Sequence, residues 1–216
     1  MRATRYGLVC LFVIFSLIAV AAGEGCSSDT GTAAGGAGAG GTSAGGAGGT
    51  IGGGIAGGGP SSLTLTIAPL GSATATGTAR FEEISGNQIK LTVTVSNVMP
   101  VSAQHGIHIH ANPDCGTSSD GDGGTVIGGA AGGHWNPEGH EHGSSVDNNH
   151  LGDIGNIMVD ANGAGTLTFM TEHWTMGTGA ANDILNHALI LHAGTDDGAT
   201  QPTGNAGGRI GCVVIR

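Results

Sequence analysis

The segment Ile89-Lys90-Leu91-Thr92-Val93-Thr94-Val95 alternates large apolar residues with polar ones along its whole length. Successive side chains of a β-strand point to opposite faces of a sheet, so this pattern predicts a strand with one buried face. Ser62-Leu63-Thr64-Leu65-Thr66-Ile67 alternates apolar and hydroxyl residues in the same way. Both segments therefore predict half-buried strands in a fold rich in β-structure.

Further strand signals follow towards the C-terminus, whereas helix signals are scarce. Residues 188–191 and 212–215 are short apolar runs, and the turn sequence Asp160-Ala161-Asn162-Gly163 separates two more strand-like segments, 157–159 and 166–169. A turn of this composition between two such segments predicts a β-hairpin.

Two long loops rich in Gly and Asp interrupt these strands, at residues 111–150 and 193–208. Loops of this length inside a compact domain are usually functional. The sequence therefore predicts an all-β domain: an antiparallel Greek-key β-barrel or sandwich of about eight strands with two long functional loops.

The N-terminus predicts export. Arg2 and Arg5 precede an apolar run over residues 8–22, which is the layout of a signal peptide covering residues 1–22. The run has about fifteen residues, whereas a membrane-spanning helix needs about twenty. A retained membrane anchor is the alternative.

The next segment, residues 23–60, is predicted to be a flexible Gly-rich tether that leads to a folded domain at 61–216. Sixteen of the thirty residues at 31–60 are glycine, so this stretch offers almost nothing to bury. Cys26 stands at its start, where a lipid-modified cysteine would attach the mature chain to a membrane. Gly23-Glu24-Gly25 is an unusual sequence before such a cysteine. A periplasmic or extracellular soluble form and a membrane-anchored lipoprotein both stay open.

The remaining cysteines and the charge balance narrow the function further. Cys115 and Cys212 are the only cysteines of the predicted domain, which favours a disulfide and an oxidising compartment. Residues 61–216 contain four Lys or Arg and fourteen Asp or Glu. This acidic domain is not expected to bind nucleic acid or anionic lipid surfaces.

The ten histidines are placed where they could bind metal. His108 and His110 share one face of a strand, because side chains repeat every two residues. His134, His142, His150 and Asp153 follow at intervals of eight, eight and three residues, a closed four-ligand set of the kind that zinc accepts. His192 follows the strand at 188–191. Imidazole-rich sites suit both copper and zinc, so composition does not choose between them.

Four motifs resemble the copper–zinc superoxide dismutase family, and the resemblance extends over about residues 65–216. They are His105-Gly-Ile-His-Ile-His110, Gly133-His-Trp-Asn-Pro137, His150-Leu-Gly-Asp-Ile-Gly-Asn156 and Gly204-Asn-Ala-Gly-Gly-Arg-Ile-Gly-Cys212. The long insert between Cys115 and His134 resembles that of bacterial secreted or periplasmic members, through the sequences at 112–115 and 131–134.

The resemblance implies a site residue by residue. It gives copper to His108, His110, His134 and His192, and zinc to His134, His142, His150 and Asp153, so that His134 bridges the two ions as an imidazolate. It also gives Asp196 a carboxylate role beside His108 and His142, pairs Cys115 with Cys212, and sets Arg209 beside the copper to attract an anionic substrate. The implied reaction is dismutation of superoxide to dioxygen and hydrogen peroxide, by alternate reduction and oxidation of copper.

Several histidines and alternatives lie outside this assignment. His105 is expected to be structural, His140 competes with His142 for the zinc, and His173 and His187 belong to no motif. The loop after His192 contains no lysine, so electrostatic steering of superoxide is expected to be weak. A homodimer stays open, since bacterial and animal members associate through different surfaces. The competing functions are a non-enzymatic copper or zinc binding module and a zinc hydrolase, the latter disfavoured by a zinc set that is already closed.

Overall fold

The computed structural model describes residues 61–85, 87–144 and 146–216. The predicted signal peptide, the tether and Cys26 lie outside the described residues and stay predictions. Within the described ranges, no helix is both long and apolar enough to cross a membrane.

Eight strands form one antiparallel sheet, in the order β7-β4-β9-β10-β1-β2-β3-β8. Their bounds are β1 Ser62–Pro69, β2 Thr76–Ile84, β3 Gln88–Ser96, β4 Gln104–His110, β7 Asp153–Met158, β8 Gly165–Thr171, β9 His187–His192 and β10 Arg209–Ile215. The long loop after β4 adds a short hairpin of β5 (Ser118–Ser119) and β6 (Thr125–Val126), and one 3₁₀ turn, η1 (Gly129–Ala131).

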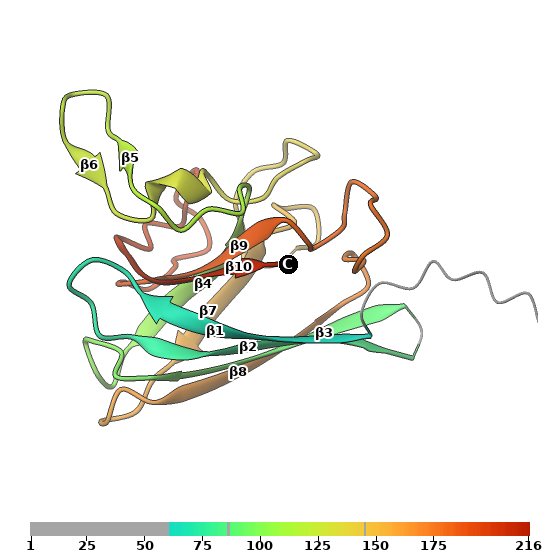
Figure 1. Ribbon diagram of the computed structural model, residues 1–216, viewed down its shortest axis with the longest axis horizontal. Helices are drawn as coiled ribbons and strands as arrows, with labels where there is room; N and C mark the ends of the chain where they lie inside the picture. Colours follow the sequence, from blue (N-terminus) through green and yellow to red (C-terminus); the bar gives the residue numbers. More distant parts are fainter. Residues whose placement is uncertain (1–60, 86, 145) are drawn as a thin grey trace, which may run out of the picture. The chain divides into compact units, whose positions relative to one another are not determined.

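The sheet folds into two layers (Figure 1), one of β1, β2, β3 and β8 and the other of β4, β7, β9 and β10. Among the described strands, the end of β1 pairs across the two layers, where Ala68 pairs with Cys212 and Pro69 with Gly211. At the other seam β7 and β8 contact each other, so the barrel is nearly closed. The connections from β3 to β4, from β7 to β8 and from β8 to β9 cross between the layers. The predicted all-β Greek-key barrel with two long loops is confirmed.

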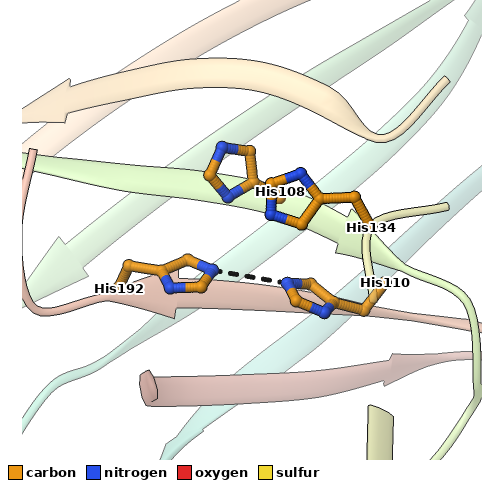
Figure 2. Close-up of side chains that lie close together, drawn as sticks. All are labelled: His108, His110, His134 and His192. Atoms are coloured by element: carbon orange, nitrogen blue, oxygen red, sulfur yellow. Dashed lines mark hydrogen bonds between the residues drawn. The ribbon is translucent and has the colours of Figure 1, made fainter. Parts of the chain in front are cut away.

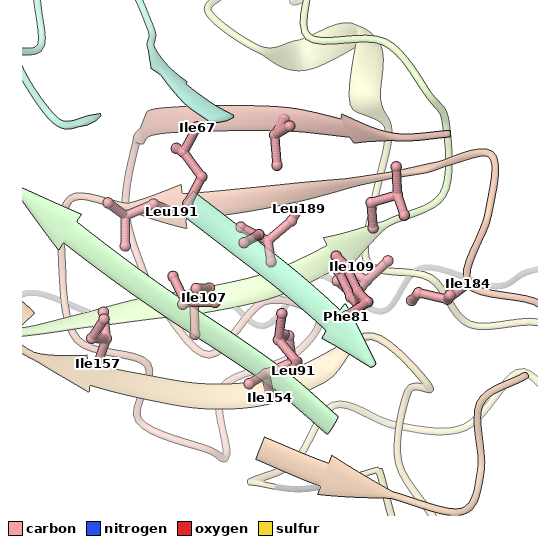
Figure 3. Close-up of a cluster of buried hydrophobic side chains, with 14 of the residues drawn as sticks. Ile67, Phe81, Leu91, Ile107, Ile109, Ile154, Ile157, Ile184, Leu189 and Leu191 are labelled. Atoms are coloured by element: carbon pink, nitrogen blue, oxygen red, sulfur yellow. The ribbon is translucent and has the colours of Figure 1, made fainter. Parts of the chain in front are cut away.

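The core lies between the two layers (Figure 3), and in β3 and β4 it is built by alternation of side chains along the strand. In β3, Ile89, Leu91, Val93 and Val95 are buried. In β4, Ile107 and Ile109 belong to this core, which sends the alternate residues His108 and His110 to the outer face of the strand. Packing of the isoleucines thus aims two imidazoles at the loops.

The predicted hairpin over 157–169 is wrong as a pair of strands. Its turn exists, with the Asp160 amide donating to the Ala164 carbonyl at 2.8 Å. However, β7 pairs with β4 and β8 pairs with β3, at opposite ends of the strand order. The turn sequence determines where the chain reverses direction. The layer that each strand joins is determined by its pairing partner, β4 for β7 and β3 for β8.

The disulfide prediction is confirmed. Cys115 and Cys212 are bonded, with 5.9 Å between their Cα atoms. The bond ties the start of the long loop 111–150 to β10, close to Arg209. Since a closed loop of about 100 residues limits the unfolded chain, this bond is expected to stabilise the domain by up to about 4.7 kcal/mol.

Candidate metal centre

Four buried imidazoles form the first group of candidate ligands (Figure 2): His108 and His110 from β4, His192 from the end of β9, and His134 from the loop after η1. Their ligand nitrogens lie within 4.8 Å of one another. The Nε2 atoms of His110 and His192 are 3.3 Å apart, and the buried Nδ1 of His108 has no hydrogen-bond partner. Buried imidazole nitrogens that lie this close together, one of them without a partner, are what a metal ion would satisfy.

The outer nitrogens of three of these rings are held by hydrogen-bond acceptors. His108 Nε2 lies 2.8 Å from Asp196 Oδ2, His110 Nδ1 lies 2.9 Å from the Gly132 carbonyl, and His192 Nδ1 lies 3.1 Å from the Gly207 carbonyl. Carbonyl and carboxylate oxygens only accept, so each outer nitrogen carries the hydrogen. The opposite nitrogen then keeps its lone pair for a metal.

Burial keeps these rings neutral. Loss of solvation lowers the pKa of His108 to about 4 and that of His192 to about 3, and it holds the pKa of His110 well below the ordinary value. At neutral pH all three rings are therefore in the unprotonated form that binds metal.

The second group surrounds one carboxylate oxygen. The Nδ1 atoms of His134, His142 and His150 lie 2.9, 3.0 and 3.3 Å from Asp153 Oδ1. Asp153 Oδ2 accepts from the Gly143 amide at 2.9 Å and from the His150 amide at 3.3 Å. Burial alone would raise the pKa of Asp153, but the hydrogen bonds from His134 and the Gly143 amide lower it. Three imidazoles and one anionic carboxylate fit a closed zinc site.

His134 belongs to both groups. Backbone pairing with His110 holds it beside the end of β4, with the Trp135 amide donating to the Ile109 carbonyl at 2.8 Å. Its Nδ1 faces Asp153, while its Nε2 is buried and has no partner. The ring stacks on His108 with 4.0 Å between centroids (Figure 2). Of the described residues, only this ring presents one nitrogen to each group and is a ligand candidate in both.

Asp196 connects the groups from outside. Its Oδ2 accepts from His108 and its Oδ1 lies 2.9 Å from His142 Nε2. Burial acts to raise the pKa of Asp196, but these hydrogen bonds and one from the Gly198 amide hold that pKa well below its usual range. Asn156 in turn holds the Asp196 backbone through two hydrogen bonds of 2.8 Å, from its Nδ2 and to its Oδ1.

Several supporting groups were not predicted from the sequence. The Gln201 side chain makes two hydrogen bonds to the His142 backbone: it accepts from the amide at 2.8 Å and donates to the carbonyl at 3.0 Å. The Gly132 and Gly207 carbonyls that orient His110 and His192 were also not foreseen. A backbone carbonyl has no sequence signature, whereas Asn156 stood inside a recognised motif and could have been singled out.

Arg209 lies beside the first group, at the wall of a depression of about 460 Å³. His110 and His192 also line this depression, together with Val126 and Ile127 from the long loop. The guanidinium donates to the Gly132 carbonyl at 2.6 Å through Nη2 and to the Gly128 carbonyl through Nη1. Partial burial lowers the pKa of Arg209, which nevertheless stays charged at neutral pH.

The other histidines stand apart from both groups. His105 is buried, with its ring nitrogens 2.9 Å from the His192 carbonyl and 3.0 Å from the Pro100 carbonyl. His140 Nδ1 lies 3.2 Å from the Asn149 carbonyl, and His173 pairs with Asp147. The ring of His187 packs at a tilt against Trp135, with 4.3 Å between centroids. Each has a structural partner instead of a place among the candidate ligands.

Comparison with known proteins identifies a family for this chain. The family model described as copper/zinc superoxide dismutase matches residues 75–215. A superoxide dismutase [Cu-Zn] of Deinococcus radiodurans is 38% identical over 146 residues, covering 65% of this chain and 77% of the relative. One of Photobacterium leiognathi is 35% identical over 158 residues, covering 71% and 86%. The solved Cu/Zn superoxide dismutase from Brucella abortus superposes with a TM-score of 0.61 at 28% identity, covering 72% of this chain and 99% of that one. The chain belongs to the copper/zinc superoxide dismutase family.

Proposed function

We propose that this protein is a superoxide dismutase that holds copper with His108, His110, His134 and His192, and zinc with His134, His142, His150 and Asp153. The observation that carries the proposal is the pair of buried ligand groups that share the ring of His134. When bound, copper supplies reversible one-electron transfer and zinc supplies a fixed, redox-silent positive charge.

The reaction consumes two superoxide ions and two protons and yields dioxygen and hydrogen peroxide. One electron passes from the first superoxide to the second through the site, so protons must reach only the second product. His134 Nε2 is suited to supply one of these protons, because it would carry a proton while Nδ1 is held in the second group and Nε2 is not a ligand, and would pass that proton to the peroxide product. Asp153 keeps the opposite side of the ring fixed during this exchange.

Arg209 provides the positive charge that attracts and orients the substrate. Its guanidinium borders the same depression as His110 and His192, and two backbone carbonyls fix its position. A charge fixed in advance stabilises an anion without reorganisation at the moment of reaction. Because His110 and His192 are neutral, Arg209 is the principal positively charged side chain that lines this depression.

We also propose export to the periplasm or the outside of the cell. The Cys115–Cys212 disulfide supports an oxidising compartment. Mass spectrometry of the mature N-terminus distinguishes a lipid on Cys26 from a soluble secreted form, and a retained residue 1 would contradict signal cleavage.

The experiment that tests the proposed function is metal analysis of the purified domain coupled to a superoxide-removal assay before and after chelation. We expect both copper and zinc in each chain, dismutation in the loaded protein, and loss of dismutation when copper is removed. Zinc without copper, or full copper loading without dismutation, would favour the metal-binding module and contradict the enzyme.

A further inference from the structure

The position of Arg209 depends on a loop segment that contains none of the proposed metal ligands. The hairpin of β5 and β6 stands out from the barrel (Figure 1), and Ile127 and Gly128 lead from it to η1. The Gly128 carbonyl accepts from Arg209 Nη1. Whatever fixes the backbone at 127–128 therefore also fixes one side of the guanidinium.

Ile127 packs directly on bare backbone in the turn between β1 and β2. A Cβ atom placed on Gly71 would lie only 2.6 Å from the Ile127 Cδ1 atom. Gly71 also has a φ of +57°, a conformation that residues with a Cβ rarely adopt. The glycine thus makes room for the isoleucine methyl, and this contact ties the long loop to the barrel.

The next residue continues the same contact towards Arg209. A Cβ atom on Gly128 would lie 2.7 Å from Leu70 Cδ1 and 3.3 Å from Arg209 Cδ. The Gly128 backbone therefore lies between Leu70 and the aliphatic part of the Arg209 side chain. A displacement of Ile127 would move the Gly128 carbonyl relative to the guanidinium.

Two hollows flank this contact. One is the depression over His110 and His192, and the other, of about 450 Å³, is lined by Leu70, Met99, Ile127, Ile210 and Arg209 among others. Ile127 is 43% exposed, and its Cδ1 atom meets the barrel at Gly71. The Gly71 contact of Ile127 and the approach of Gly128 to Leu70 support the Gly128 backbone from the barrel side, and the Ala131 amide donates to the Gly128 carbonyl at 3.2 Å.

We propose that Ile127, packed on Gly71, is a positioning residue for Arg209, and that this contact determines how strongly the site holds small anions. The inference rests on the proposed function only for the identity of the anion. The positioning itself is a property of the polypeptide and is measurable without metal.

The first measurement is rotation of the Arg209 guanidinium about its Nε–Cζ bond, by NMR of the metal-free domain. Hydrogen bonds at both Nη atoms should make this rotation slow in the wild type. Ile127→Ala is expected to speed the rotation by about threefold or more, because one carbonyl partner loses its support. Met99→Ala is the matched control, since Met99 is an exposed apolar residue of the same hollow but does not adjoin a carbonyl that Arg209 uses.

The second measurement is the affinity of the copper-loaded domain for azide, followed by visible absorption. Arg209→Gln sets the full effect, and Ile127→Ala should weaken azide binding by about threefold or more in the same direction. Gly71→Ala should act like Ile127→Ala, since its new methyl would displace Ile127 Cδ1. Adding Ile127→Val, which removes Cδ1, should restore much of the loss.

Unchanged rotation and unchanged azide affinity in Ile127→Ala, or equal effects of Met99→Ala, would overturn the inference. So would a Gly71→Ala variant whose Arg209 rotation and azide affinity equal those of the wild type. If the wild type fails to dismutate superoxide while the rotation responds as described, the proposed function falls and the positioning role stands.

Discussion

The two ligand groups share His134 but are built in different ways. In the first, His108, His110 and His192 stand on β4 and β9, where adjacent pairing such as His108 with Ile190 fixes their spacing. In the second, His142 and His150 come from an irregular loop and meet around Asp153, the first residue of β7. The strand group is thus arranged by the β-ladder, whereas the loop group is arranged by one buried negative charge. Changes at that charge should therefore separate the two groups.

The largest expected effect comes from Asp153→Asn. The substitution keeps the volume but removes the anionic oxygen around which three Nδ1 atoms gather. Zinc affinity should fall about 100-fold or more, while copper affinity changes by less than about tenfold. Competition titrations with chelators of known affinity measure both values. Equal losses for copper and zinc would show that the strand group depends on the same charge. The two groups would then not be arranged in different ways.

Gly204→Ala should have the second-largest effect, because it would displace Asp196, which contacts one ligand of each group. A Cβ atom there would lie 1.9 Å from Asp196 Oδ1 and 2.5 Å from His142 Nε2, and the residue has a φ of +63°. Zinc affinity should fall about tenfold, since displacing an outer partner of a ligand typically costs 10- to 100-fold. Gly208→Ala is the matched control in the same loop, where an added Cβ would meet nothing within 4 Å. Equal behaviour of the two variants in zinc titration would contradict the role of Asp196.

The strand group should also determine how the metal-free domain responds to acid. His108 and His192 have folded pKa values of about 4 and about 3, below the 6.5 of the unfolded chain, so the unfolded state binds more protons between those values. Stability is then full above about pH 6.5 and is lost as the pH falls. Each histidine contributes a slope of about 1.4 kcal/mol per pH unit in that window. Urea unfolding from pH 7.5 to 4.5 measures this slope, and His192→Ala should reduce it. A slope unchanged by the substitution would contradict the buried neutral state.

The smallest expected effect belongs to His140→Ala. His140 is the sequence neighbour that competes with His142, yet its ring faces the Asn149 carbonyl. Zinc affinity should change by less than about twofold, measured in the same titration, because the substitution leaves all four groups around zinc in place. A loss comparable with that of His142→Ala would mean that the loop group has been assigned the wrong histidine.

The fold was predictable where side-chain alternation was strong, as in β1 and β3. The strand β2 was not foreseen, because Gly77, Arg80 and Glu82 dilute its apolar pattern, and its place is determined by pairing with β1 and β3 on either side. The sequence also suggested pairing β7 with β8 across a good turn, whereas sheet closure places these strands in different layers.

The candidate site was predictable where the chemistry requires particular side chains. Imidazoles and a carboxylate at repeated intervals carry their own signal, so all seven proposed ligands were expected. The acceptors that orient the rings, such as the Gly132 and Gly207 carbonyls, belong to the backbone and are available in any sequence. Their selection depends on loop conformation, which periodicity does not encode.

Paired metal analysis of two variants tests whether one ring, His134, belongs to both groups. Purified His134→Ala should lose both copper and zinc, because each group loses a ligand. His192→Ala should lose copper and keep its zinc, because only the strand group is touched. Copper and zinc per chain, counted in both variants and the wild type prepared together, give the answer. Loss of a single metal in His134→Ala, or equal loss of both in His192→Ala, would contradict the shared ligand.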